Sequence, residues 1–144
     1  MTSKQISQGE SDRTFALIFQ TGDTVIEPLT RFAQENKLFA AHFTAIGAFS
    51  DLTLAYFDWE SRQYQKIPLH EQVEVLSLIG DIADDKGKAK VHAHAVVGKR
   101  DGSAHGGHLI EAHVRPTLEV ILTESPAHLR RKTDPTSGLA LISL

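Results

Sequence analysis

The chain has 144 residues and a mass of 15.8 kDa, which is the size of one globular domain. Its 41% apolar and 23% charged residues are ordinary globular values, so the composition excludes a disordered or collagen-like chain. The formal net charge of −3 argues against the strong positive field of a dedicated nucleic-acid binder, and the absence of cysteine excludes disulfides and thiolate metal sites.

The N-terminal residues 1–12 are polar, and we expect them to form a flexible tail before a single domain at 13–144. The apolar stretch 13–19 predicts a buried strand. Val25, Ile26, Leu29 and Phe32 then follow helical spacing, which predicts one helix that ends near residues 36–37. Thr24 and Glu27 match a capping box at its start.

The rest of the chain alternates apolar and polar residues in a pattern typical of strands. Strands are predicted at 41–49, 52–59, 63–69, 71–81, 88–98, 108–114 and 117–123, and a glycine-rich loop at 98–107. Residues 84–87 have the composition of a hairpin turn. The basic run 130–132 is typical of a solvated tail. One helix among hairpin-linked strands indicates an α+β fold with a largely antiparallel sheet.

Eight histidines are present, and two of them stand in the segment KVHAHAVV at residues 90–97. Because side chains alternate along a strand, His92 and His94 project from the same face, with Cα atoms about 6.6 Å apart. Imidazoles at this spacing can bind one metal ion. The simpler interpretation is a pair of histidines that form hydrogen bonds across a half-buried sheet face.

A third ligand has two candidates, His105 and His108, on either side of Gly106 and Gly107. We favour His108 because it opens an apolar strand, and regular elements hold ligands more firmly than loop tips. The glycine pair is expected to turn the chain so that His108 faces the first two histidines. Three histidines and one open position are the usual layout of a catalytic zinc site.

Glu111 is a weak candidate for a general base or a fourth ligand. Regular alternation points it away from His108, so a carboxylate at the surface or at a subunit interface is the favoured interpretation. No other residue is assigned a catalytic role.

The combined pattern of residues 43–58, 71–82, 92–102 and 106–109 resembles the plants-and-prokaryotes conserved (PPC) domain, over about residues 13–124. The resemblance implies an α+β homotrimer. It also implies a metal, often zinc, that prokaryotic members can bind through an H-x-H and a Gly-Gly-His, here His92, His94 and His108. The architecture is more distantly similar to that of acetolactate decarboxylase.

Two functional hypotheses follow. The first is a cytoplasmic protein that binds zinc or another divalent transition metal, with an open position that acts on a small-molecule ligand and makes the protein an enzyme. The second is a DNA-binding or DNA-associated regulatory module without catalysis, as plant members of the family act at DNA. The chain has no R-G-R-P core, so we expect weak DNA binding or none. No apolar run approaches the roughly 20 residues that span a membrane, so no membrane partner is expected.

Overall fold

The computed structural model describes residues 1–10, 12–125 and 128–144, which form one helix and nine strands of a single sheet. In chain order the elements are β1 (Thr2–Gln8), β2 (Arg13–Gln20), α1 (Ile26–Glu35), β3 (Ala40–Asp58), β4 (Gln63–Leu69), β5 (Val73–Asp85), β6 (Lys88–Gly98), β7 (Ala104–Glu124), β8 (Arg130–Thr133) and β9 (Ala140–Ser143). The strand order is β1-β2-β7-β3-β5-β8-β9, with β4 beside β3 and β6 paired with both β5 and β7. The single β5–β8 bridge is parallel and all the other pairs are antiparallel, which confirms the predicted α+β class.

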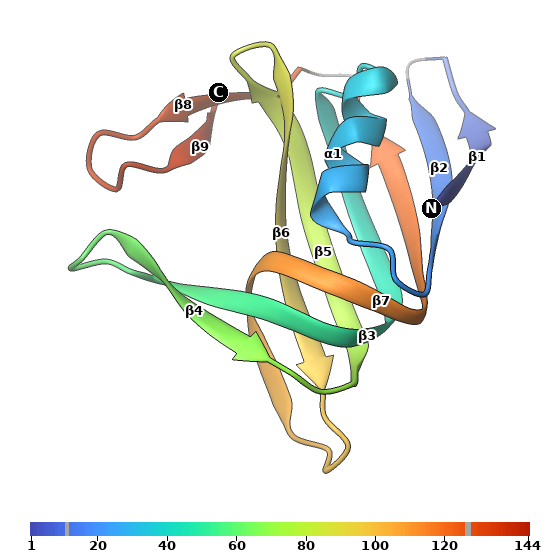
Figure 1. Ribbon diagram of the computed structural model, residues 1–144. Helices are drawn as coiled ribbons and strands as arrows, with labels where there is room; N and C mark the ends of the chain where they lie inside the picture. The colour runs from blue at the N-terminus through green and yellow to red at the C-terminus, as the bar shows by residue number, and fades with distance from the viewer. Residues whose placement is uncertain (11, 126–127) are drawn as a thin grey trace.

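Two long strands, β3 and β7, replace four shorter strands that the sequence predicts. Their ladder shifts register between Gly47 and Phe49, between Phe49 and Asp51, and between Thr53 and Leu54. Such bulges bend a strand without ending it, so a break in the alternation is not a break in the strand. Figure 1 shows β7 curving across the molecule, and this curvature gives the sheet a concave face that encloses the core.

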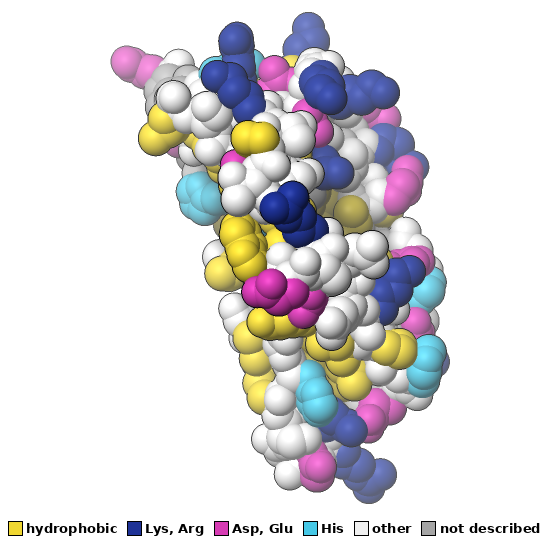
Figure 2. All heavy atoms as spheres, turned by 90° about the vertical axis from the view of Figure 1, so that its left-hand side faces the viewer, with side chains coloured by type: hydrophobic (Ala, Val, Ile, Leu, Met, Phe, Trp, Pro, Cys, Tyr) yellow, Lys and Arg dark blue, Asp and Glu magenta, His cyan; other side chains and the backbone are white. Residues whose placement is uncertain are grey.

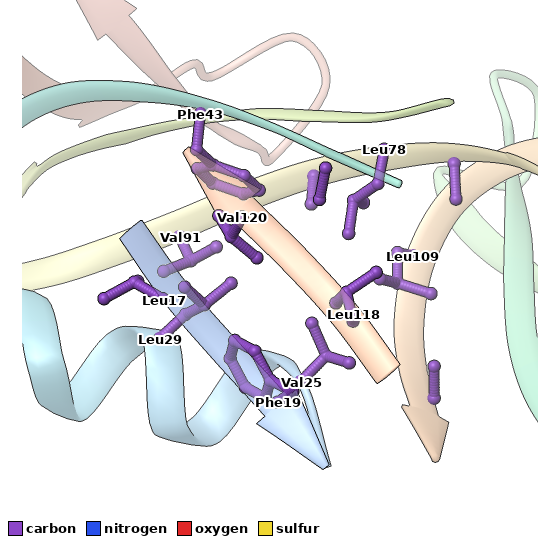
Figure 3. Packing of buried hydrophobic residues seen from close by; sticks show 14 of the residues in the cluster. Leu17, Phe19, Val25, Leu29, Phe43, Leu78, Val91, Leu109, Leu118 and Val120 are labelled. Carbon is purple, nitrogen blue, oxygen red and sulfur yellow. The ribbon is translucent and has the colours of Figure 1, made fainter. Parts of the chain in front are cut away.

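Helix α1 covers this inner face of the sheet (Figure 1). Its buried residues are Pro28, Leu29, Phe32 and Ala33, and Leu29 and Phe32 belong to the predicted apolar stripe. Figure 3 shows side chains from the helix packed against those from β2, β3, β6 and β7. Full burial of one such leucine or phenylalanine stabilises the fold by about 1.5–3 kcal/mol. The largest fully buried side chains include Leu17, Phe19, Leu29, Phe43, Leu118 and Leu122.

The helix begins differently from the capping box that the sequence predicts. Val25 is the N-cap residue and no side chain caps the helix. Thr24 instead forms a strand-like bridge with His113. The Glu27 carboxylate accepts a hydrogen bond from the Arg31 guanidinium at 2.6 Å, as helix residues four apart can do. Thr24 is therefore bridged to β7 and does not cap the helix.

The N-terminal segment also differs from the predicted flexible tail. Residues 2–8 form strand β1, which pairs antiparallel with β2 from Thr2–Ile18 to Gln8–Arg13. All its side chains are exposed. Backbone groups alone provide this pairing, because an edge strand offers unpaired N–H and C=O groups to any extended segment. A polar sequence therefore gave no signal for it.

Two hairpins, β3–β4 and β8–β9, project from the same side of the sheet (Figure 1). The second one follows β7 and carries the C-terminus. Within the described ranges, no helix has the length and apolar character that would let it cross a membrane.

Candidate metal centre

The candidate site lies where β6 and β7 begin to pair. His92 and His94 stand two residues apart on β6, so their side chains share one face. The β6–β7 ladder places His108 directly opposite His94. On the other side of β6, Asp81 of β5 pairs with His92. Local alternation and the antiparallel register therefore bring the three histidines together.

The three imidazole rings form a compact triangle. Their centroids are 5.0 Å apart for His92 and His94, 5.1 Å for His92 and His108, and 5.5 Å for His94 and His108. One ligand nitrogen from each ring lies within 4.8 Å of the other two. The pattern that the sequence predicts is present as a spatial cluster.

Neighbouring side chains hold two of the rings in place. The Tyr64 ring of β4 stacks on His108 with centroids 4.7 Å apart and an interplanar angle of 27°. One carboxylate oxygen of Asp81 lies 3.7 Å from Nδ1 of His92. The other oxygen accepts a short hydrogen bond from Nη2 of Arg131. A carboxylate next to a histidine ligand typically fixes the orientation of its ring.

The electrostatic environment favours the neutral forms of His94 and His108. Burial, followed by the nearby His92, His94 and Lys90, lowers the pKa of His108 from 6.5 to about 4. Burial and the nearby His92 also lower the pKa of His94. Neutral imidazoles have a free lone pair at neutral pH, as metal coordination requires.

Asp81 stays ionised beside these histidines. Burial alone would raise its pKa, but the nearby His92 and the charge of Arg131 outweigh burial, and the pKa is lowered. The carboxylate is therefore negative at neutral pH and is shared between a histidine of the cluster and a buried guanidinium.

The glycine pair does not turn the chain, contrary to the sequence prediction. The turn lies at residues 99–103, and Gly106 and Gly107 are inside β7. A Cβ at Gly107 would approach the Ala55 carbonyl oxygen of β3 to 2.8 Å. The absent side chain lets β7 pack closely against its neighbours just before His108.

The other sequence candidates lie outside the cluster. His105 of β7 pairs with Val97 of β6 and is not among the three grouped histidines. The exposed Glu111 has a carboxylate oxygen 3.9 Å from Nε2 of His113. Nδ1 of His113 lies 2.7 Å from the Asp51 carboxylate, so both residues belong to a separate acidic environment.

Three residues of the site were not predicted: Tyr64, Asp81 and Arg131. Arg131 lies in the basic run that the sequence predicts to be a solvated tail, yet its side chain is only 5% exposed. Its burial depends on an ion pair with Asp81, which is 50 positions away in the chain. Pairings of this kind have no local signal in a single sequence.

The residues of the cluster fit a divalent transition metal ion. Among the described residues, no hydrogen-bond partner is found for the buried Nδ1 of His108. An unpartnered buried imidazole nitrogen is costly, and a metal ion would supply the partner. Three imidazoles are a donor set that suits zinc, copper, iron and nickel.

Comparisons with known proteins agree with this fold. The Plants and Prokaryotes Conserved (PCC) domain model matches residues 6–126. Among solved structures, the chain is similar to a PPC protein from Pyrococcus horikoshii, with 31% identity, a TM-score of 0.86 and 92% of each chain covered. A metal-containing protein from Archaeoglobus fulgidus has 32% identity and a TM-score of 0.85, over 98% of this chain and 100% of that chain. A candidate DNA-binding protein from Ralstonia eutropha JMP134 has 28% identity and a TM-score of 0.84, with 90% of each chain covered.

The fold is a single sheet with one helix packed against it, and in this chain the sheet carries the three-histidine cluster. The chain belongs to the plants and prokaryotes conserved domain family, as the sequence resemblance predicts. The more distant likeness is one of fold: a Staphylococcus aureus protein similar to alpha-acetolactate decarboxylase has a TM-score of 0.57 and 12% identity, over 76% of this chain and 51% of that chain. No curated protein sequence matches the chain significantly.

Proposed function

We propose that this PPC domain binds zinc or another divalent transition metal through His92, His94 and His108. The observation that carries the proposal is the grouping of three ligand nitrogens within 4.8 Å. The unpartnered Nδ1 of His108 supports it. With three protein ligands, one coordination position stays open for water or a small ligand.

The chain's own residues have distinct parts in this proposal. A bound divalent ion would supply a Lewis acid that polarises a ligand or activates water. His92, His94 and His108 hold the ion. Asp81 orients His92, and Tyr64 fixes the plane of the His108 ring by stacking on it. Glu111 is not assigned a role, because it lies outside the cluster.

Metal content tests the proposal directly. The full chain is stripped with a chelator, reloaded with Zn²⁺, and measured by elemental analysis beside His94→Ala and the matched control His105→Ala. We expect close to one ion per chain in the wild type and in His105→Ala, and a near-complete loss in His94→Ala. Equal metal content in His94→Ala and the wild type would refute the assignment.

We also propose that the sheet face beside the cluster is buried against further copies in a homotrimer. Ile79 pairs with His94 on this face, and Thr44 pairs with both Ile79 and Ile121. Large aliphatic side chains are exposed here: Ile46 at 61%, Ile79 at 54% and Ile121 at 45%. Adjacent exposed aliphatic side chains mark a protein interface. The family resemblance supports a second and a third copy as the occupants.

Light scattering during size-exclusion chromatography measures the mass of the assembly and tests the trimer. The expected mass is three times the 15.8 kDa of one chain. Ile79→Glu is expected to give monomers, because it places a charge in the interface. Ile6→Glu, at a residue that is 52% exposed on β1, is the control and should stay trimeric. A monomeric wild-type protein would contradict the trimer.

A DNA-associated role is the second candidate function, favoured by the Ralstonia relative described as a candidate DNA-binding protein. Charge argues against it. Figure 2 shows lysine and arginine side chains near both ends of the face that it draws, with acidic side chains among them. With a net charge of −3, we expect no measurable binding to duplex DNA in a mobility-shift assay. Binding that weakens steeply as salt rises would support the DNA role.

A further inference from the structure

A cavity of about 490 Å³ opens beside the histidine cluster, between the two projecting hairpins. His92 and His108 line it on the sheet side, and Tyr64 of β4 lines it from the β3–β4 hairpin. Residues 138–142 of the β8–β9 hairpin complete the lining. The volume lies within the range of small-molecule sites. Figure 2 looks onto the side from which both hairpins project.

The cavity walls are mainly aliphatic. The lining on the sheet side includes Val91, Leu109 and Ile110, and the lining on the hairpin side includes Leu139, Leu141 and Ile142. Tyr64 is the aromatic exception, and its ring already stacks on His108. Walls of this kind favour a ligand with a compact aliphatic body.

The charged groups of the cavity favour an anion. Lys90, Asp81 and Arg131 line it, and Asp81 is already shared between Arg131 and His92. Within the described parts of the chain, no acidic side chain pairs with Lys90. Lys90 precedes His92 by two residues on β6, so its side chain shares the face of the cluster. It is the cation available to a ligand.

The buried Arg131 side chain connects the β8–β9 hairpin to the strand beside the histidine cluster. The Arg131 side chain, 5% exposed, donates hydrogen bonds to the Asp81 carboxylate on β5 and, at 2.9 Å, to the Ala140 carbonyl on β9. Its Nε is buried and no partner for it is found among the described residues. The hairpin lies beyond residues 6–126, the stretch that the family model matches.

We propose that this cavity binds a small aliphatic monocarboxylate, with the carboxylate between Lys90 and the histidine cluster and the hydrocarbon body against the β8–β9 hairpin. The placement of the carboxylate beside a metal ion rests on the proposed function. The recognition by Lys90 and by the hairpin does not. A single free cation and aliphatic walls suit a monoanion with an apolar body better than a phosphate, which usually meets several donors.

Calorimetric titration of the full chain tests the proposal, in Zn²⁺-loaded and in metal-free form, with metal content measured separately. The probes are pentanoate, acetate, pentanamide and inorganic phosphate. We expect pentanoate to bind roughly tenfold or more tightly than acetate, because the additional methylene groups are buried. It should also bind roughly tenfold or more tightly than pentanamide, which lacks the charge. Phosphate should not compete.

Variants test separately the contact of the carboxylate with Lys90 and the contact of the hydrocarbon body with the hairpin. Lys90→Gln should weaken pentanoate binding roughly tenfold and leave pentanamide binding and metal content unchanged. Its control, Lys132→Gln, removes an exposed lysine of β8 that does not line the cavity. Ile142→Ser should reduce the preference for pentanoate over acetate. Amide shifts of Leu139, Leu141 and Ile142 on pentanoate addition should report the hairpin contact.

The outcomes separate the two proposals. Metal-free protein that still prefers pentanoate in a Lys90-dependent way supports the cavity, even if the histidines bind no metal. Fully loaded protein that binds pentanoate no better than acetate, or phosphate as well as pentanoate, overturns the carboxylate proposal while the metal site stands. Unchanged pentanoate affinity in Lys90→Gln also overturns it.

Discussion

The three-histidine cluster and His113 have opposite surroundings in this protein. His92, His94 and His108 have one another as neighbours, and burial with mutual repulsion lowers the pKa of His94 and His108. His113 faces a carboxylate, and its hydrogen bond to Asp51 raises its pKa. The surroundings thus favour the neutral form of His94 and His108 and the protonated form of His113. Neutral imidazoles at close range suit a metal ion, whereas a protonated imidazole beside a carboxylate forms an ion pair.

The largest expected difference between the cluster and His113 is in metal affinity. His108→Ala removes a proposed ligand and should weaken Zn²⁺ binding by more than about a hundredfold. This loss is larger than the loss expected when only a residue that contacts a ligand is altered. His113→Ala, on the same strand, should leave the affinity unchanged. Competition with a chromophoric chelator measures both. Equal losses of Zn²⁺ affinity in the two variants would contradict the proposed difference between His108 and His113. Circular dichroism checks that both variants are folded.

Asp81 lies beside the cluster and Asp51 lies beside His113. Substitution of these two carboxylates should differ in its effect on Zn²⁺ affinity. Asp81→Asn removes the charge that orients His92 and should weaken Zn²⁺ binding about tenfold to a hundredfold. Asp51→Asn makes the same chemical change beside His113 and should have no effect on metal affinity. Both variants are measured in the same competition titration. A larger effect of Asp51→Asn would show that the proposed centre is misplaced.

The third contrast concerns the protonation of His113. NMR titration of the wild type should place its pKa above 6.5, because the protonated ring donates to Asp51. In Asp51→Asn the pKa should return toward 6.5. An unchanged value would mean that Asp51 does not set the charge of this histidine.

The same pair gives a small pH dependence of the free energy of unfolding. Because the folded-state pKa of His113 is raised, its contribution is complete below about 6.5 and is lost as pH rises through the folded value. The hydrogen bond from His113 lowers the pKa of Asp51, so the Asp51 contribution is present above 3.8 and is lost as pH falls through its folded value. Both side chains are 42% exposed, so solvent screening limits the effect to about 0–1 kcal/mol. Urea unfolding of wild type and Asp51→Asn at several pH values measures it.

The features that the sequence predicted depend on short-range patterns. The H-x-H spacing fixes a shared strand face, and the apolar stripe of α1 fixes which side of the helix is buried. His108 lies beside His92 and His94, as the sequence predicts, although the glycines before it permit close strand packing and do not form a turn.

The features that the sequence did not predict depend on pairing over long distances. The contacts of Asp81 with His92 and Arg131 need the β5–β6 register and the docking of the C-terminal hairpin. The stacking of Tyr64 on His108 needs β4 and β7 to lie on the two sides of β3. Strand β1 is held by backbone pairing with β2, which polar side chains do not reveal. Composition and periodicity report burial, but they do not report which strand lies beside which.

X-ray absorption at the zinc edge of the reloaded full chain tests the central claim most directly. A site formed by His92, His94 and His108 predicts three imidazole nitrogens at about 2.0–2.1 Å from the metal and one further light ligand. The same measurement on His108→Ala should show the loss of one imidazole or of the bound metal. A wild-type spectrum dominated by oxygen ligands, without imidazole scattering, would contradict the claim.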